Sequence, residues 1–146
     1  MAPTPSQSAE DYLERIHELI QEKGYARVVD IASSLRVTQA SVTSMVQRLG
    51  EQGYLNYEKY RGVLLTEKGL EVAVGIQERH EMLSRFFSLL EIDEATQRRD
   101  IEGIEHHLSP ATVAVMADLA RFLEENPGVL ERFRESRRLN RRRNAA

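Results

Sequence analysis

The chain contains no cysteine and no tryptophan among its 146 residues. Without cysteine, disulfide bonds and thiolate-bound metals are excluded, so any metal must be held by oxygen atoms and imidazole nitrogens. Such donors favour hard divalent ions over a closed structural zinc site. A chain that lacks disulfides is also typical of the cytoplasm, and we expect a cytoplasmic location.

Long apolar stretches and an excess of positive charge are missing as well. The sequence has no run of about 18 apolar residues, so we expect no membrane span. Residues 1–8 lack a basic start and an apolar stretch, which predicts a short flexible lead and no secretory signal. A formal net charge of −3 is unusual for a protein that binds DNA by charge alone.

What the first half does contain is a succession of short amphipathic helices. Apolar residues at helical spacing predict helices over residues 9–23, 28–35 and 39–52, and Thr38 is a good N-cap for the third. Alternating apolar residues on either side of a polar turn then predict a β-hairpin over residues 55–65. This order of elements is typical of a winged helix-turn-helix, which we assign to residues 1–70.

The second half is predicted to be entirely helical. Thr66 caps a long helix to about Leu90, and Asp93 caps the helix that follows. Ser109-Pro110 begins another helix that Asn126-Pro127-Gly128 closes, and an arginine-rich tail follows from Glu131. The expected fold is therefore mostly α, with an all-helical domain over residues 71–146 after the winged helix-turn-helix.

The outward side of the third predicted helix carries short polar side chains that suit a DNA groove. Polar faces are often only solvated, and winged helices sometimes bind proteins, but the complete arrangement favours double-stranded DNA. The candidates for this helix are Thr38, Gln39, Ala40, Ser41, Thr43, Ser44 and Gln47, and those for phosphate contacts are Arg48, Lys59 and Arg61.

An acidic cluster stands near the middle of the second half. Glu102, Glu105 and His106 are spaced i, i+3 and i+4, so on a helix they project from one face. Two carboxylates and an imidazole held together repel one another or lose solvation unless a cation lies between them. A bound divalent metal is the simplest such cation, although the cluster could also be a hydrated helix face.

Three further donors complete the candidate set. Asp11 and Glu14 share a face of the first predicted helix, and His80 lies along the buried stripe of the long helix. Each has a simpler interpretation alone, since Asp11 could close a capping box with Ser8 and His80 could be a hydrogen-bonded core histidine. Together the six residues provide four carboxylates and two imidazoles, which suit a two-ion site formed where three helices converge.

These patterns resemble a known family, the manganese-responsive transcriptional regulators related to the diphtheria toxin repressor. The resemblance runs from Glu10 to about Glu125 and is strongest over residues 22–28, 57–62 and 100–107. In that family the metal ligands fall at the positions of Asp11, Glu14, His80, Glu102, Glu105 and His106.

The resemblance implies more than the residues show by themselves. It implies a homodimer joined through the C-terminal helices, two Mn²⁺ ions per chain, no organic cofactor, and repression of manganese-uptake genes at a DNA operator. Iron-responsive relatives have a methionine where this chain has Asp11, and they tend to add an SH3-like domain for which this chain leaves no room. We expect that Fe²⁺, Zn²⁺, Co²⁺ or Cd²⁺ can substitute for Mn²⁺.

The expected mechanism is pre-organisation of a dimer by metal. Two ions bridging the helices would fix the two recognition helices about 34 Å apart, or a multiple of this, and change the formal charge from −3 to +1 per chain. Three alternatives remain open from the sequence. They are an iron- or zinc-responsive repressor, a di-metal carboxylate enzyme in a helical bundle, and a metal-independent regulator that answers an organic ligand.

Overall fold

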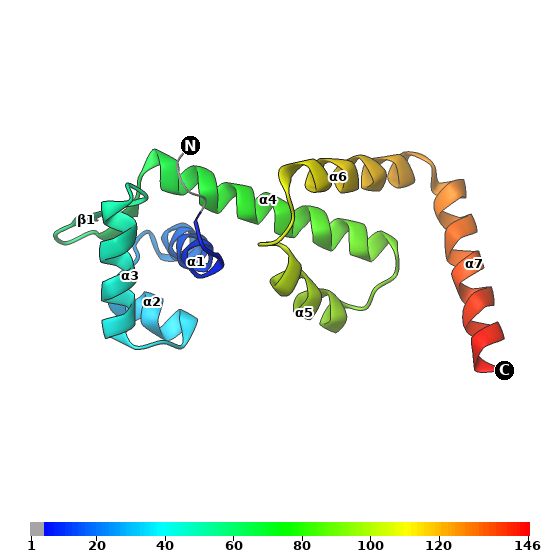
Figure 1. Cartoon of the computed structure of the whole chain (residues 1–146), viewed down its shortest axis with the longest axis horizontal. Helices are drawn as coiled ribbons and strands as arrows, with labels where there is room; N and C mark the ends of the chain where they lie inside the picture. The colour runs from blue at the N-terminus through cyan, green and yellow to red at the C-terminus, as the bar shows by residue number, and fades with distance from the viewer. Residues whose placement is uncertain (1–4) are drawn as a thin grey trace. The chain divides into compact units, whose positions relative to one another are not determined.

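The computed structural model describes residues 5–146, which are mostly helical with one two-stranded hairpin (Figure 1). They divide into two compact units, one ending at Gln77 and the other running from Glu78 to Ala146. The predicted fold class is confirmed, because a winged helix-turn-helix is followed by a helical unit. No helix in this described range is long and apolar enough to cross a membrane.

The first unit contains the predicted helices and hairpin. Its elements are α1 (Gln7–Lys23), α2 (Val28–Leu35), α3 (Gln39–Glu51), β1 (Leu55–Glu58) and β2 (Gly62–Leu65), followed by the first turns of α4 (Glu67–Leu89). Of the flexible lead expected over residues 1–8, residues 1–4 lie outside the described residues, and α1 already begins at Gln7. The hydroxyl of Ser6 caps α1 by accepting from the N–H of Ala9 at 3.2 Å. The capping box considered for Ser8 and Asp11 is therefore wrong, because the cap lies two residues earlier.

Apolar side chains from α1, α2, α3 and β2 form the core of the first unit. Leu13, Ile16, Ile31, Leu49 and Val63 are all fully buried there. Burying a side chain of this size stabilises the fold by roughly 1.5–3 kcal/mol relative to exposure. The core thus holds α3 at a fixed angle to α1 and leaves the opposite side of α3 to solvent.

The hairpin is joined to the segment before α2 by backbone contacts. Leu55 pairs with Leu65 and Glu58 with Gly62 in the antiparallel register. The N–H of Val63 donates to the carbonyl oxygen of Ala26 at 2.8 Å. Gly62 has a φ of 83°, and a Cβ there would overlap that same carbonyl oxygen, so glycine is required at this position.

The second unit contains the rest of α4, then α5 (Glu94–Ile104), α6 (Pro110–Glu125) and α7 (Pro127–Ala145). The predicted N-cap at Asp93 is confirmed, and Ser109, which was predicted only to begin the next helix, is an N-cap as well. Asp93 accepts from the N–H of Thr96 at 2.9 Å, and Ser109 accepts from the N–H of Thr112 at 3.2 Å. These caps satisfy backbone donors at the starts of α5 and α6 and so define where both helices begin.

The helix α7 was not predicted from the sequence. Asn126-Pro127-Gly128 closes α6 at Glu125 as expected, but Pro127 also occupies the first turn of α7, where its missing N–H costs nothing. Leu130 anchors the new helix in the core that also contains Leu83 and Ile101. The guanidinium of Arg134 donates to the carbonyl oxygen of Leu89 at 2.8 and 3.0 Å, which links α7 to the end of α4.

Candidate metal centre and nucleic-acid interface

His80 and Glu105 meet within the second unit. His80 lies on α4, and its Nδ1 is 3.0 Å from Oε2 of Glu105, which follows the last residue of α5. The Glu105 side chain is only 5% exposed, whereas that of His80 is 48% exposed. A carboxylate that loses its water in this way needs a charged or hydrogen-bonding partner, and the imidazole is one.

A second imidazole lies on the other side of the same carboxylate. His106 Nε2 is 3.5 Å from Oε1 of Glu105, and the His106 side chain is 1% exposed. One buried carboxylate therefore has an imidazole nitrogen near each oxygen. This combination of oxygen and nitrogen donors is the type that binds Mn²⁺, Fe²⁺ or Zn²⁺, so the residues fit a divalent metal.

The backbone at this point is held from α4. The Nη1 of Arg79 donates to the carbonyl oxygen of Glu105 at 3.3 Å, and the N–H of Glu105 donates to the carbonyl oxygen of Ile101. These bonds position the carboxylate, since they restrain the turn that carries it. Arg79 was not among the residues predicted from the sequence, where its position next to His80 was the only available signal.

The other three metal candidates lie on α5 and α1. Glu102 is exposed on α5, and no hydrogen bond or ion pair links it to Glu105 or His106 in the described residues. Asp11 and Glu14 lie one turn apart on α1 in the first unit, and both are half-buried. The α-helix ends at Ile104; Glu105 keeps helical dihedral angles as its C-cap, and His106 lies in the turn that follows.

The candidate DNA-contacting residues lie on the solvent side of α3 and on the hairpin. Val42 and Leu49 of α3 are buried, while the hydroxyl of Thr38 donates to that of Ser41 at 2.9 Å at the exposed start of the helix. All the candidates are exposed, namely Thr38, Gln39, Ala40, Ser41, Thr43, Ser44, Gln47, Arg48, Lys59 and Arg61. Such a face can offer hydroxyls, amides and cations to a duplex.

The tip of the hairpin adds aromatic side chains to the cationic ones. Tyr57 and Tyr60 are 70% and 86% exposed. The Lys59 ammonium lies 5.5 Å from the ring of Tyr60, and Arg61 forms an ion pair with Glu58 at 3.3 Å. Exposed aromatic rings beside cationic side chains suit a wing that contacts another molecule.

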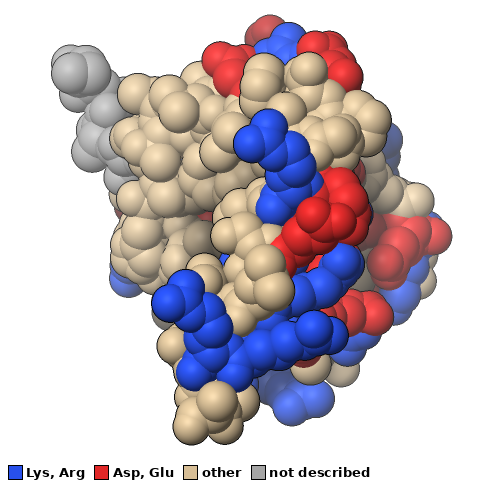
Figure 2. All heavy atoms as spheres, turned by 90° about the vertical axis from the view of Figure 1, so that its right-hand side faces the viewer, with Lys and Arg blue, Asp and Glu red and all other residues tan. Residues whose placement is uncertain are grey.

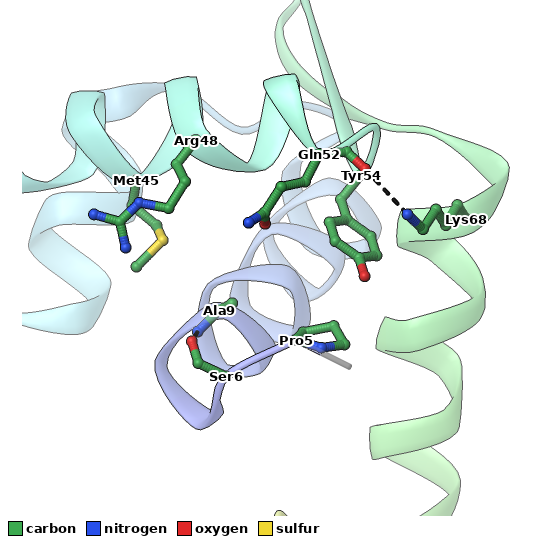
Figure 3. Close-up of a pocket in the computed structure, with 8 residues that line it drawn as sticks. All are labelled: Pro5, Ser6, Ala9, Met45, Arg48, Gln52, Tyr54 and Lys68. Carbon is green, nitrogen blue, oxygen red and sulfur yellow. Dashed lines mark hydrogen bonds between the residues drawn. The ribbon is translucent and has the colours of Figure 1, made fainter. Parts of the chain in front are cut away.

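A pocket of about 400 Å³ opens between the start of α1, the end of α3 and the start of α4 in the first unit (Figure 3). Lys68 lies over the ring of Tyr54 at 4.3 Å and donates to the carbonyl oxygen of Gln52 at 3.1 Å. Arg48 borders the same pocket, so two cations flank it. Lys68 was not predicted from the sequence, because its place here depends on contacts with residues of the preceding helix and loop.

Comparison with known proteins agrees with both halves of this description. Residues 5–63 match the family described as "Iron dependent repressor, N-terminal DNA binding domain". Residues 66–134 match "Iron dependent repressor, metal binding and dimerisation domain".

Relatives are similar over nearly the whole chain. The HTH-type transcriptional regulator MntR of Lysinibacillus sphaericus (strain C3-41) is 48% identical over 135 residues, covering 92% of this chain and 96% of that protein. The regulator of the same name from Geobacillus kaustophilus (strain HTA426) is 48% identical over 138 residues, covering 94% and 96%.

Solved structures agree in fold. The manganese regulator SloR is 26% identical with a TM-score of 0.68, covering 82% of this chain and 55% of its own. ScaR with bound Cd²⁺ is 26% identical with a TM-score of 0.70, covering 81% and 55%. The chain thus spans about half the length of these two proteins. On the sequence matches, the chain belongs to the iron-dependent, diphtheria-toxin-repressor-like family, in its manganese-responsive branch, and is a metal-dependent DNA-binding transcriptional repressor.

Proposed function

We propose that the chain senses manganese and represses manganese-uptake genes in the cytoplasm, and that it has no enzymatic activity. Residues 1–70 serve as the DNA-binding domain, and residues 71–146 serve for dimerisation and metal binding. The observation that carries the proposal is the buried Glu105 carboxylate with an imidazole at each oxygen, in a chain that has no cysteine. The proposed ligands of two Mn²⁺ ions per chain are Asp11, Glu14, His80, Glu102, Glu105 and His106.

The donor set favours manganese over softer metals. Four carboxylates and two imidazoles provide mostly hard oxygen atoms, which suit Mn²⁺, and no sulfur atom competes for it. Asp11 adds an oxygen at the position where iron-responsive relatives have methionine. Because manganese binds weakest in the usual divalent series, Fe²⁺, Zn²⁺, Co²⁺ and Cd²⁺ are expected to bind the same residues.

Charge explains how these residues respond to metal. Four carboxylates gathered at one site would repel one another without a cation between them. Divalent ions held by the proposed ligands would supply the positive charge that offsets this repulsion. Binding would thus order the helices that carry the ligands, and less entropy would be lost when the recognition helices bind DNA.

The second unit also offers a surface for a second copy of the chain. Val115, Leu119 and Phe122 are 67%, 45% and 50% exposed on one face of α6. A row of large apolar side chains in contact with water is unfavourable, so we propose that α6 contributes to the homodimer. The two α3 helices of such a dimer would read half-sites about 34 Å apart, or a multiple of this distance.

The test is duplex binding across a panel of divalent ions. Fluorescence anisotropy with a duplex selected from a random-sequence pool is measured with Mn²⁺, Fe²⁺, Zn²⁺, Co²⁺ or Cd²⁺, anaerobically, and again with chelator. The proposal expects Mn²⁺ to raise the affinity by roughly 5- to 150-fold, the usual range for coupled sites. A response to iron or zinc but not to manganese would overturn the metal assignment.

Two controls separate the alternatives from other classes. A regulator that answers an organic ligand would bind DNA equally well with and without chelator. A di-metal carboxylate enzyme would consume oxygen with ferrous iron, and such bundles use two Glu-x-x-His motifs. This chain has one, from Glu14 to His17, which favours the regulator.

A further inference from the structure

The C-terminal helix has a charge opposite to that of the rest of the chain. Residues 131–146 contain seven arginines and two glutamates, a net charge of +5. Residues 1–130 contain 13 basic and 21 acidic residues, a net charge of −8. On the face of the molecule that includes α7, Lys and Arg side chains gather into a patch (Figure 2).

Two of these arginines hold the helix, and five remain available. Arg134 bonds to Leu89, and Arg138 forms ion pairs with Glu91 at 3.2 Å and Glu131 at 3.1 Å. The other five are exposed and form no ion pair with the described residues; they are Arg132, Arg137, Arg141, Arg142 and Arg143. Since α7 is anchored through Arg134 and Arg138, the free guanidinium groups are displayed on an ordered helix.

We propose that this basic surface, formed by Arg137, Arg141, Arg142 and Arg143 on α7, binds the phosphates of duplex DNA. Guanidinium groups bind phosphate oxygens in a bidentate manner, and every basic residue of this segment is arginine. The proposal rests on the proposed function only in that it takes the chain to be a DNA-binding protein. Residues 135–146 lie beyond the region that matches the family model.

The charge of the first unit explains why a second contact is useful. Up to residue 77 the chain has eight basic and ten acidic residues, so the recognition half is itself slightly repelled by DNA. Neutralised phosphates supply most of the non-specific affinity for DNA. An arginine-rich helix would therefore add affinity without adding sequence specificity.

An anionic membrane fits this surface less well than DNA does. Helices that lie on membranes bury a broad apolar face among the lipids. Beyond Phe133, the only large apolar side chain of α7 is Leu139, and the remaining residues are polar, small or charged. The chemistry is that of phosphate binding in water, which duplex DNA offers at high density.

The test compares two matched double variants of the full chain. Arg137→Gln/Arg141→Gln removes two charges from α7, and Arg98→Gln/Arg99→Gln removes two from α5, where both side chains are 78% exposed. Anisotropy with a mixed-sequence duplex is measured against salt, with and without Mn²⁺. The α7 variant should lower the slope of log affinity against log salt by about 0.9 for each phosphate that the protein no longer neutralises, and the α5 variant should leave it unchanged.

Three further measurements test the role of charge, the integrity of the fold and the response to Mn²⁺. Arg137→Lys/Arg141→Lys should restore most of the slope, because it restores the charge, and circular dichroism should show an intact helix in every variant. The fold-increase that Mn²⁺ causes in affinity for the selected duplex should be equal in wild type and the α7 variant. The absence of that increase in wild type would contradict the proposed function alone. An unchanged slope in the α7 variant, an equal fall in the α5 variant, or tail-dependent binding to phosphatidylglycerol vesicles but not to DNA would overturn this inference.

Discussion

The Nδ1 of His80 lies 3.0 Å from Oε2 of Glu105, a residue 25 positions further along the chain. This contact joins α4 to the turn after α5 and places one carboxylate between two imidazoles. Because this carboxylate is buried, it is the one among the four candidate carboxylate ligands that water can least replace.

Replacing Glu105 should therefore weaken metal binding more than any change of an exposed acid. Glu105→Gln keeps the size of the side chain but removes its charge, and we expect Mn²⁺ affinity to fall at least roughly 10- to 100-fold. Isothermal titration with Mn²⁺ measures this directly. Glu78→Gln, an exposed acid on the same α4 helix as His80, should bind Mn²⁺ like wild type. Equal affinities for wild type and Glu105→Gln would remove Glu105 from the ligand set.

Changes on the exposed face of α3 should separate DNA recognition from metal binding. Gln39→Ala/Ser44→Ala removes polar groups that can reach base edges, and each base contact is worth about 1–3 kcal/mol of discrimination. Selectivity is measured as the affinity ratio between a selected duplex and mixed-sequence DNA, with Mn²⁺ present. The Mn²⁺ affinity of the variant should not change. If metal binding failed while selectivity persisted, the recognition helix would be misassigned.

The guanidinium of Arg134 should contribute to the stability of the second unit. It is 25% exposed and makes two hydrogen bonds to the carbonyl oxygen of Leu89. Since charged hydrogen bonds of this kind are worth about 1.5–3 kcal/mol, partial exposure leaves an expected loss of about 1 kcal/mol in Arg134→Gln. Urea unfolding measures the loss, and Arg132→Gln, which alters an exposed arginine, is the control. Equal stability of the two variants would show that the bonds to Leu89 contribute nothing.

The cap of α5 should make stability depend on pH in acid. The hydroxyl and backbone N–H of Thr96 donate to Asp93 and lower the pKa of its carboxyl group. Because the unfolded value is about 3.9, this contribution is complete above about pH 4 and is lost as the pH falls through the lower folded value. Asp93→Asn still accepts the N–H but cannot titrate.

We therefore expect the urea midpoint of Asp93→Asn to fall less than that of wild type between about pH 5 and about pH 2.5. Thr96→Val, which removes the hydroxyl and keeps the N–H, should give an intermediate fall. If the urea midpoint of Asp93→Asn fell as much as that of wild type over this pH range, Asp93 would not contribute to the acid sensitivity of the fold.

Local signals in the sequence predicted most of the fold. Thr38, Asp93 and Ser109 are capping residues in front of apolar helical patterns, and each caps the helix that was predicted after it. The chemistry of a cap depends on residues three positions apart, so it can be recognised without tertiary information.

The features that the sequence did not predict depend on contacts between residues far apart in the chain. The helix α7 was missed because its residues are charged almost all round, and its anchors, Leu130 and Arg134, act through contacts with distant residues. For the candidate site, spacing grouped Glu105 with His106 but could not predict the contact between His80 and Glu105. Spacing also placed Glu102 on their face; it is exposed on α5, and no hydrogen bond or ion pair joins it to them in the described residues.

The most direct test of the central claim is anomalous diffraction at the manganese absorption edge from crystals of the full chain grown with Mn²⁺. The account predicts two peaks per chain, with ligands drawn from α1, from His80 on α4, from Glu102 on α5 and from the turn that carries Glu105 and His106. A map without peaks, or with manganese bound only by residues outside these four segments, would contradict it.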